Sequence, residues 1–459
     1  MAITLQFIGA ARYVTGSKHL IIVNDKRILL DCGMVQGPRK IANRANQNLA
    51  LDAESIDVVV LSHAHIDHSG SLPRLVKLGF EGSIYCTEPT KDLLGVLLPD
   101  SAHIQSQDAR YLKKKGHVFE PPYDLQDVEK TLKRVHEVPY YKTFEVCPGV
   151  TVQFLDAGHI LGSAFVVIDV DDGTHKKRIV FTGDHGRRDM PILRDPDKIP
   201  ECDVLITEST YGNRAHPPAI DMEAALEKIV NEEVRDGGRI LIPAFSVGRT
   251  QNVLMYLGKL AKEGRIPRQQ IFIDSPLSKK ATNITARHPQ VFDEEMQAMM
   301  RDGHDPFHFD GVRYVADVEE SKSLNGVRSG IILSASGMCE AGRILHHLKQ
   351  SIGRPEDCVL AVGYMARGTL GRRLVEKYEK VKIFGERYKV QCKVRSISGL
   401  SAHADYKELL RSFRHLAPRA RVFVVHGEEE ASLPFSDRLI DAGFQQVDVP
   451  VKREKFTIC

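Results

Sequence analysis

Short apolar runs recur along the first half of the chain, with glycine, aspartate or serine at or near their ends. They cover residues 3–9, 26–33, 57–65, 151–159, 178–185 and 203–210. Runs of this length and punctuation are typical of buried β-strands. Other stretches carry apolar residues at helical spacing, as at Met222, Leu226 and Ile229, which predicts one buried helix face. This alternation of strands and helices predicts an α/β fold.

The middle of the chain repeats the alternation with different strand ends. The runs at 238–249, 269–276, 329–337 and 358–368 end in small or basic residues, and a helical pattern lies at 251–262. These segments predict a second α/β domain. Another strand-like run at 393–403, an amphipathic helix around Leu409 and Phe413, and a run at 421–428 follow it.

Composition narrows the class of protein. The 459 residues allow two large domains or about three smaller ones. Lys and Arg number 63 against 60 Asp and Glu, a net charge of +3, which excludes a uniformly basic nucleic-acid coat. The sequence has no long apolar stretch and no secretory signal, so we expect a cytoplasmic protein without a membrane span. Its 8 cysteines form no C-x-x-C pair, which argues against a disulfide framework or a thiolate zinc site.

Side chains able to do chemistry come almost always directly after an apolar run. In open α/β sheets, ligands bind at the carboxyl ends of strands, so residues in that position converge even when they are distant in sequence. The residues in question are Asp31, His63, His65, His159, Asp184, Glu208, His403 and His426.

The densest cluster is the string His63-Ala64-His65-Ile66-Asp67-His68. An isolated H-x-H pair is as easily a solvated polar loop as a ligand pair. A carboxylate packed with three imidazoles is costly unless a cation or hydrogen bonds compensate it. The full string therefore favours metal binding. We expect His63 and His65 to point one way from the turn, and Asp67 and His68 to point the other way, so the string suits two metals.

This string resembles the signature of the metallo-β-lactamase superfamily. Asp31 in LLDCG, His159 in AGHILGSA and Asp184 in FTGDHG extend the resemblance in the expected order. It implies two zinc ions bridged by Asp184, with Asp31 behind the ligands and orienting them. The implied ligands are His63, His65 and His159 for one ion, and Asp67 and His68 for the other.

Three later motifs resemble the β-CASP subgroup, the nucleases related to RNase J and to the endonuclease subunit of the cleavage and polyadenylation specificity factor. They are Glu208 in TESTYGNR, His403 in LSAHADY and His426 in VVHGEEE. PAFSVGR, SASGMCEAGR and GYMARGTLGR are similar to the β-CASP insert, so the resemblance covers nearly the whole chain. It implies that His403 faces the scissile phosphate, that Glu208 orients it and that His426 is added to the second metal site.

The resemblance also implies the architecture: a four-layer αββα metallo-β-lactamase fold with an inserted α/β domain. We expect the metallo-β-lactamase domain at 1–210 and 389–459 and the β-CASP insert at 211–388. The N-terminal KH modules of archaeal relatives and the extra C-terminal domain of RNase J are not expected here.

The implied chemistry is phosphodiester hydrolysis. Two metals roughly 3.5–4 Å apart would bind and deprotonate a bridging water, and the hydroxide would attack phosphorus. Asp67 would take part as ligand and in catalysis, and His403 would protonate the departing 3′-oxygen. Imidazole and carboxylate ligands favour zinc, with manganese or iron also compatible.

The insert is expected to hold the nucleic acid. Guanidinium groups and free backbone amides near Gly-rich turns can grip phosphates, although any one basic residue is more often simply solvated. The other histidines, including His185, His346 and His347, are given no role. The candidates are Arg249, Lys279, Ser336, Gly337, Arg343 and Arg367.

The preferred interpretation is a zinc-dependent ribonuclease that cuts single-stranded RNA internally, in a groove between two domains, leaving a 5′-phosphate and a 3′-hydroxyl. Alternatives are a 5′-to-3′ exoribonuclease, a DNA nuclease of the same family and a non-catalytic RNA-processing scaffold. DNA-repair members lack a histidine matching His426, small thioester hydrolases lack the insert, and a scaffold would need broken ligands. A homodimer remains open.

Overall fold

The computed structural model describes residues 3–37, 39–114, 116, 119–216, 220–363, 365 and 368–458. The chain divides into two compact units. Unit 1 comprises residues 1–188, 195–215 and 403–459, and unit 2 comprises 189–194 and 216–402. Unit 2 is therefore inserted into unit 1, and each unit has its own sheets and core.

The first sheet of unit 1 is mixed. Strands β22, β1, β2 and β3 are antiparallel neighbours, and β3, β4, β5 and β6 are parallel. The order across the sheet is β22 (Lys455–Thr457), β1 (Thr4–Gly9), β2 (Lys18–Val23), β3 (Lys26–Leu30), β4 (Val58–Val60), β5 (Ser83–Cys86) and β6 (Val135–Glu137).

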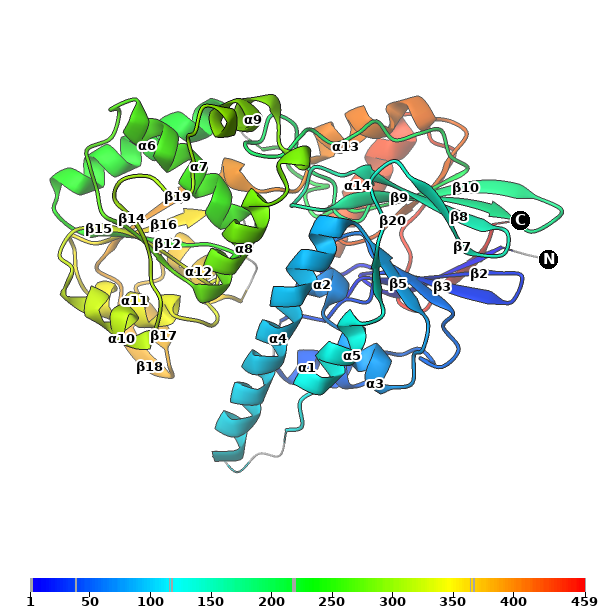
Figure 1. Ribbon diagram of the computed structural model, residues 1–459, viewed down its shortest axis with the longest axis horizontal. Helices are drawn as coiled ribbons and strands as arrows, with labels where there is room; N and C mark the ends of the chain where they lie inside the picture. The colour runs from blue at the N-terminus through cyan, green and yellow to red at the C-terminus, as the bar shows by residue number, and fades with distance from the viewer. Residues whose placement is uncertain are drawn as a thin grey trace. The chain divides into compact units, whose positions relative to one another are not determined.

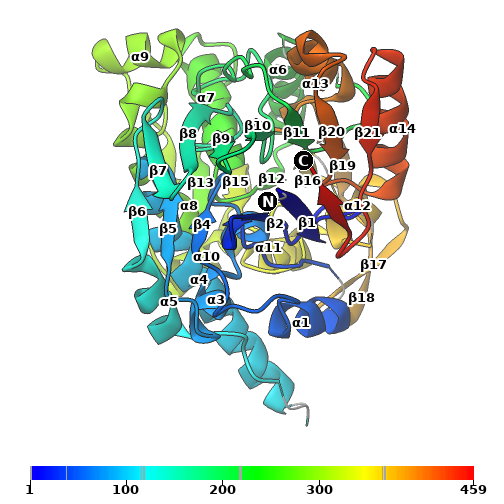
Figure 2. The same ribbon diagram turned by 90° about the vertical axis from the view of Figure 1, so that its right-hand side faces the viewer.

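The second sheet of unit 1 is mixed in the same way. Strands β7 to β10 are antiparallel, and β10, β11, β20 and β21 are parallel. Figure 2 shows this order from β7 across to β21. The strands are β7 (Thr143–Cys147), β8 (Val150–Asp156), β9 (Ala164–Asp171), β10 (Lys176–Phe181), β11 (Val204–Thr207), β20 (Arg421–Val424) and β21 (Gln446–Asp448).

The two sheets of unit 1 pack face to face with helices outside. Phe7, Phe154 and Phe181 belong to the buried cluster between the sheets, and Phe413 and Phe435 bury the outer face of the second sheet under α13 and α14. Figure 1 shows the resulting helix-sheet-sheet-helix layers. The helices are α1 (Arg39–Gln47), α2 (Ile66–Ser69), α3 (Leu72–Lys77), α4 (Glu88–Lys114), α5 (Leu125–Leu132), α13 (Tyr406–Phe413) and α14 (Glu429–Asp441).

Unit 2 is built on an all-parallel sheet of six strands. Its central strands β12, β13, β15 and β16 are buried at every position, as expected of a parallel sheet covered on both faces. The order is β14 (Val312–Tyr314), β13 (Ile271–Asp274), β15 (Gly330–Ser334), β12 (Arg239–Pro243), β16 (Cys358–Val362) and β19 (Lys393–Ile397).

The helices of unit 2 lie on both faces of this sheet (Figure 1). Leu241, Ile332, Ile344 and Leu348 form part of the core beneath α11. A small hairpin of β17 (Lys380–Ile383) and β18 (Glu386–Lys389) completes the unit. The helices are α6 (Ile220–Arg235), α7 (Arg249–Lys262), α8 (Pro276–Ala286), α9 (Glu294–Arg301), α10 (Val318–Ser323), α11 (Ile344–Ser351) and α12 (Leu370–Val375).

The structure confirms the α/β class and the αββα fold with an inserted parallel domain. The expected strands are present but shorter, because the polar residues at their carboxyl ends leave the sheet; the run at 57–65 keeps only Val58–Val60 as strand. The expected domain limits of 1–210, 211–388 and 389–459 stay predictions. Of the two compact units, β19 belongs to unit 2, where it pairs with β16.

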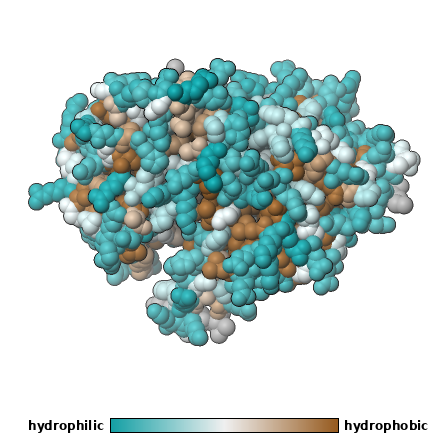
Figure 3. Space-filling model, viewed as in Figure 1, coloured by the Kyte–Doolittle hydropathy of each residue, from teal (hydrophilic) through white to brown (hydrophobic). Residues whose placement is uncertain are grey.

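On the face drawn in Figure 3 the surface is mostly hydrophilic, with hydrophobic residues in patches between polar ones. Among the described residues, no helix is both long enough and apolar enough to cross a bilayer.

Candidate metal centre

The histidines and aspartates expected to bind metal lie together in unit 1. His63 and His65 follow β4, and Asp67 and His68 lie in the short helix α2 directly after them. The other three ligand candidates follow strands of the second sheet: His159 after β8, Asp184 after β10 and His426 after β20. Two sheets therefore supply one site.

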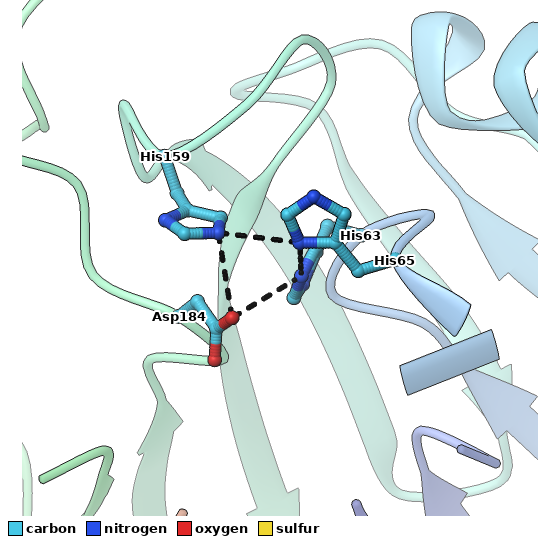
Figure 4. Close-up of side chains that lie close together, drawn as sticks. All are labelled: His63, His65, His159 and Asp184. Carbon is cyan, nitrogen blue, oxygen red and sulfur yellow. Dashed lines mark hydrogen bonds and ion pairs between the residues drawn. The ribbon is translucent and has the colours of Figure 1, made fainter. Parts of the chain in front are cut away.

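The first cluster contains His63, His65, His159 and Asp184 (Figure 4). The Nδ1 atom of His65 lies 3.1 Å from Nε2 of His63 and 3.3 Å from Nε2 of His159. Oδ2 of Asp184 is 3.4 Å from Nε2 of His63 and 3.4 Å from Nε2 of His159. Four potential donor atoms thus surround one point.

The second cluster contains Asp67, His68 and His426. Nε2 of His68 lies 3.0 Å from Nε2 of His426, and that atom of His426 is 3.5 Å from Oδ2 of Asp67. Oδ1 of Asp184 is 3.1 Å from Nε2 of His68. Asp184 therefore turns one carboxylate oxygen toward each cluster, which is the arrangement of a bridging ligand.

The spacing of these donors fits metal ions. Ligands held about 2.0–2.1 Å from a tetrahedral zinc stand about 3.3–3.4 Å apart, close to the separations in the first cluster. Oδ1 of Asp184 and Nδ1 of His159 are buried and have no hydrogen-bond partner among the described residues. The nearest groups to this oxygen are Nε2 of His68 at 3.1 Å and Nδ1 of His426 at 3.6 Å, and a cation held among these donors would compensate the buried carboxylate.

The protonation states of the first cluster favour metal binding. Burial lowers the pKa of His63 and His159, and it lowers the pKa of His65 to about 3. These imidazoles are therefore neutral at pH 7 and present a lone pair. Burial disfavours the charged form of Asp184, but His426 and His68 outweigh it and hold its pKa well below the usual value.

In the second cluster, burial would lower the pKa of His68, but Asp184 and Asp31 outweigh it and raise this pKa well above the usual value, so His68 releases a proton when it binds a metal.

Asp31 orients His68 from behind. Its Oδ2 accepts a hydrogen bond of 2.6 Å from Nδ1 of His68, which turns Nε2 toward the cluster. Ser62 fixes the carboxylate with its backbone N–H at 2.8 Å and its hydroxyl at 3.0 Å. A buried carboxylate behind a ligating histidine is a common way of setting the tautomer and ring orientation.

His403 and Glu208 form a pair beside the first cluster. Nδ1 of His403 lies 3.0 Å from one oxygen of Glu208 and 3.1 Å from the other. Glu208 is fully buried and also accepts a bond of 2.6 Å from the backbone N–H of His185. Burial alone would lower the pKa of His403, but Glu208 and Asp184 outweigh it and raise this pKa to about 9. His403 is therefore protonated at pH 7.

Two supporting contacts were not expected from the sequence. Oγ1 of Thr210 lies 3.2 Å from Nδ1 of His426, and the backbone N–H of His426 donates to the carbonyl of Ala10 at 2.7 Å. Thr210 lies two residues after Glu208 in the same motif, and this was the only feature of the sequence that could have indicated its contact with His426. No role was expected for His185 from the sequence. In the structure its backbone N–H, and not its ring, donates a hydrogen bond to Glu208.

The expected RNA-binding residues lie in unit 2, apart from Arg367, which is outside the described residues. Arg249 begins α7, where its Nη1 donates to the carbonyl of Val362 at 2.9 Å. Arg343 donates to Oδ1 of buried Asp274 at 2.6 Å. Lys279 is exposed on α8, and Ser336 and Gly337 lie in the loop after β15.

Comparison with known families gives matches over most of the chain. A metallo-beta-lactamase superfamily domain matches residues 20–190, a Beta-Casp domain matches 250–374, and a Zn-dependent metallo-hydrolase RNA specificity domain matches 387–450. Ribonuclease TTHA0252 of Thermus thermophilus is 36% identical over 93% of both chains. The chain belongs to the β-CASP ribonuclease family.

Other known proteins are also similar to this chain. Transcription termination factor FttA of Methanosarcina mazei is 32% identical over 92% of this chain and 67% of its own length, and that of Methanocaldococcus jannaschii is 30% identical over 99% and 72%. A solved protein of unknown function from Enterococcus faecalis V583 shares the fold, with a TM-score of 0.55 at 14% identity over 100% of both chains. As a family member with an intact His/Asp cluster, this chain is a metal-dependent hydrolase.

Proposed function

We propose that this β-CASP protein is a two-zinc ribonuclease that cuts single-stranded RNA internally and leaves a 5′-phosphate and a 3′-hydroxyl. One observation carries the proposal: Asp184 presents Oδ2 to His63 and His159 and Oδ1 to His68. The same Oδ2 lies 3.9 Å from Nδ1 of His403, which is paired with Glu208. Two adjoining cation sites beside a protonated histidine match the requirements of phosphodiester hydrolysis.

The ligands are His63, His65, His159 and Asp184 for one ion, and Asp67, His68, His426 and the other oxygen of Asp184 for the second. When bound, two zinc ions supply Lewis acidity, which lowers the pKa of a bound water and neutralises charge growing on the phosphate. Imidazole with carboxylate suits zinc, and manganese is the alternative cofactor.

The chain itself supplies the proton for the leaving group. Glu208 holds Nδ1 of His403, so Nε2 is the nitrogen that carries the transferable proton to the departing 3′-oxygen. Glu208 is fixed by the backbone N–H of His185, which keeps the pair aligned. Because the proton donor is a side chain and the nucleophile is water, the ribose 2′-hydroxyl has no part in bond breaking.

RNA is the favoured substrate for two reasons. The region 387–450 matches a domain described by its RNA specificity, and a relative that covers nearly the whole chain is a ribonuclease. A histidine stands at position 426, the position at which the DNA-repair branch differs. A 5′-to-3′ exoribonuclease is the main alternative, since the same chemistry serves both modes.

One RNA prepared in linear and circular form separates the two modes. We expect the purified protein to open the circle at a rate similar to that for the linear form, because internal cleavage needs no end. End-group analysis should find 5′-phosphate and 3′-hydroxyl, and a 2′-deoxyribose at the cut should still allow cleavage. An intact circle would favour the exonuclease, and a 2′,3′-cyclic phosphate as primary product would contradict attack by water.

A further inference from the structure

The carboxyl ends of four neighbouring strands in unit 2 form one edge of the parallel sheet. Strands β13, β15, β12 and β16 lie side by side in that order. Asp274 is the last residue of β13, and the residues that follow the other three strands include Ser336 with Gly337 after β15, Ala244 with Phe245 after β12, and Gly363 after β16. In parallel sheets this edge is where ligands bind.

Phe245 is exposed at this edge. Its exposed fraction is 41%, whereas its neighbours Ala244 and Ser246 are exposed by only 1% and 8%. A single exposed hydrophobic side chain is ordinary on a protein surface. Two features set Phe245 apart: Gly337 packs against its ring, and Arg249 and Arg343 lie in the segments that follow β12 and β15.

Gly337 fixes the position of the ring. A Cβ atom at Gly337 would lie 2.9 Å from Cδ2 and 3.0 Å from Cε2 of Phe245, so only glycine lets the loop after β15 approach this closely. The carbonyl of Phe245 also accepts bonds from the N–H and the hydroxyl of Thr250, at 3.3 and 2.8 Å. One edge of the ring is therefore packed, and part of its surface faces solvent.

Two arginines at the same edge are held by protein oxygens. The guanidinium of Arg249 donates to the carbonyl of Val362 and lies over Gly363, where a Cβ would come within 2.2 Å of Nη1. Arg343 is held by Asp274, which is buried and also accepts bonds of 2.6 Å from Ser321 and His347. Both guanidinium groups are thus placed before a ligand arrives, which favours phosphate recognition.

Arg343 and Gly337 belong to one closed loop. The backbone N–H of Ser336 donates to the carbonyl of Ala341 at 3.1 Å, and the N–H of Ile344 donates to the carbonyl of Ala335 at 3.2 Å. The loop that packs on the phenyl ring therefore also carries the arginine.

We propose that Phe245 is a base-stacking platform, on which a nucleobase of single-stranded RNA lies while Arg249 and Arg343 bind phosphates of the same strand. Stacking on an aromatic ring tolerates every base, because each base has a π-face. This inference rests on the proposed function only for the identity of the ligand, single-stranded RNA. The experiment that tests it measures binding and not cleavage, so a wrong stacking site can be distinguished from a protein that does not cleave RNA.

The chain contains no tryptophan, so Phe245→Trp introduces a single fluorescent reporter at the platform. We place it in a His403→Ala background and add an eight-nucleotide oligoadenylate, with a gel to check that the RNA stays intact. Stacking should quench the fluorescence by roughly half or more. An abasic oligomer of equal length and charge should bind, as followed by anisotropy, without quenching.

Phe384→Trp is the matched control, because Phe384 is an exposed phenylalanine of the same unit, 53% exposed at the β17–β18 turn. Its fluorescence should not respond to oligoadenylate. Equal quenching by the abasic oligomer, equal quenching of Phe384→Trp, or bound RNA without quenching of Phe245→Trp would each overturn the proposal.

A second pair of variants measures the affinity. Phe245→Leu keeps an apolar side chain but removes the ring, and we expect it to weaken oligoadenylate binding roughly 5- to 150-fold, the usual range for one stacked base. Phe245→Tyr should bind within a few-fold of the parent chain. Parental affinity in Phe245→Leu, with unchanged thermal unfolding, would also overturn the proposal.

Discussion

The strand ends of unit 1 carry buried histidines and aspartates, whereas the central strand ends of unit 2 carry arginines, small residues and an exposed phenyl ring. In unit 1 the donor atoms stand 3.0 to 3.6 Å apart and face one another. In unit 2 the guanidinium groups of Arg249 and Arg343 are each held by a protein oxygen. One topological rule thus serves two ligands of opposite charge.

The two regions differ in the sign of the charged groups that they bring together. In unit 1, buried carboxylate oxygens and imidazole nitrogens face one another, and such a donor set suits cations. In unit 2, Arg249 and Lys279 bring positive charge to the surface, where phosphates can reach it. Substitutions in unit 1 should therefore act on metal content and rate, and those in unit 2 on RNA affinity.

The largest effect is expected for Asp184→Asn, because one carboxylate serves both metal clusters. Elemental analysis should show loss of metal from both sites, against about two ions per chain in the parent. The cleavage rate should fall by more than roughly 10⁴-fold, since each ion supplies several kcal/mol of transition-state stabilisation. Asp169→Asn, which removes a surface partner of Arg178, should keep both metals. Full metal content in Asp184→Asn would refute the bridge.

His403→Ala should separate the rate from metal content. We expect both metals and RNA affinity to stay within a few-fold of the parent, while cleavage slows roughly 10²- to 10⁴-fold through loss of a positioned acid. Glu208→Gln should lose less, since the proton donor remains. His136→Ala is the control, because His136 is exposed on β6. Loss of metal in His403→Ala would show that His403 is a ligand instead.

Asp31→Asn tests whether the two clusters can be weakened separately. Asp31 has a φ of 58°, a conformation that asparagine tolerates. The amide should orient His68 less well, so affinity at the second cluster should fall roughly 10- to 100-fold. The first cluster should be weakened less, because Asp31 reaches His63 only through the hydroxyl of Ser62. Chelator competition with purified protein measures both steps. Equal weakening of both clusters would contradict a role confined to His68.

The smallest effect is expected in unit 2, for Lys279→Ala. Removing one phosphate contact should weaken single-stranded RNA binding only a few-fold and should reduce the slope of log affinity against log salt by roughly 0.7. Lys380→Ala, a change to another exposed lysine of unit 2, should leave the slope as it is. A Lys279→Ala slope equal to the parent's would remove this residue from the RNA contact.

Much of the metal centre could be predicted because its residues follow strands directly. His63, Asp184 and His426 each come within three residues of a buried run, and the end of a run shows which edge of the sheet a residue joins. Helix α7 could also be predicted, because its buried apolar residues recur at helical spacing.

Contacts that depend on tertiary packing could not be predicted. Asp274 lies at a strand end like the ligands, yet it binds Arg343 and His347 rather than a metal, and only the packing of β13 against α11 shows this. The short strands β6 and β14 are defined by the neighbours with which they pair, and three residues carry too little pattern to reveal them. Phe245 lies in the PAFSVGR motif, but no pattern in the sequence shows that its side chain is exposed.

The insertion of unit 2 into unit 1 also fixes an order of assembly during synthesis. His63, His65, His159 and Asp184 all leave the ribosome before unit 2 is made, whereas His403 and His426 follow it. A nascent or truncated chain that stops within unit 2 holds the donors of the first cluster but lacks His403, the proposed proton donor, and His426, a proposed ligand of the second cluster. Under the proposed mechanism, cleavage would begin only after the last segment has joined the fold of unit 1.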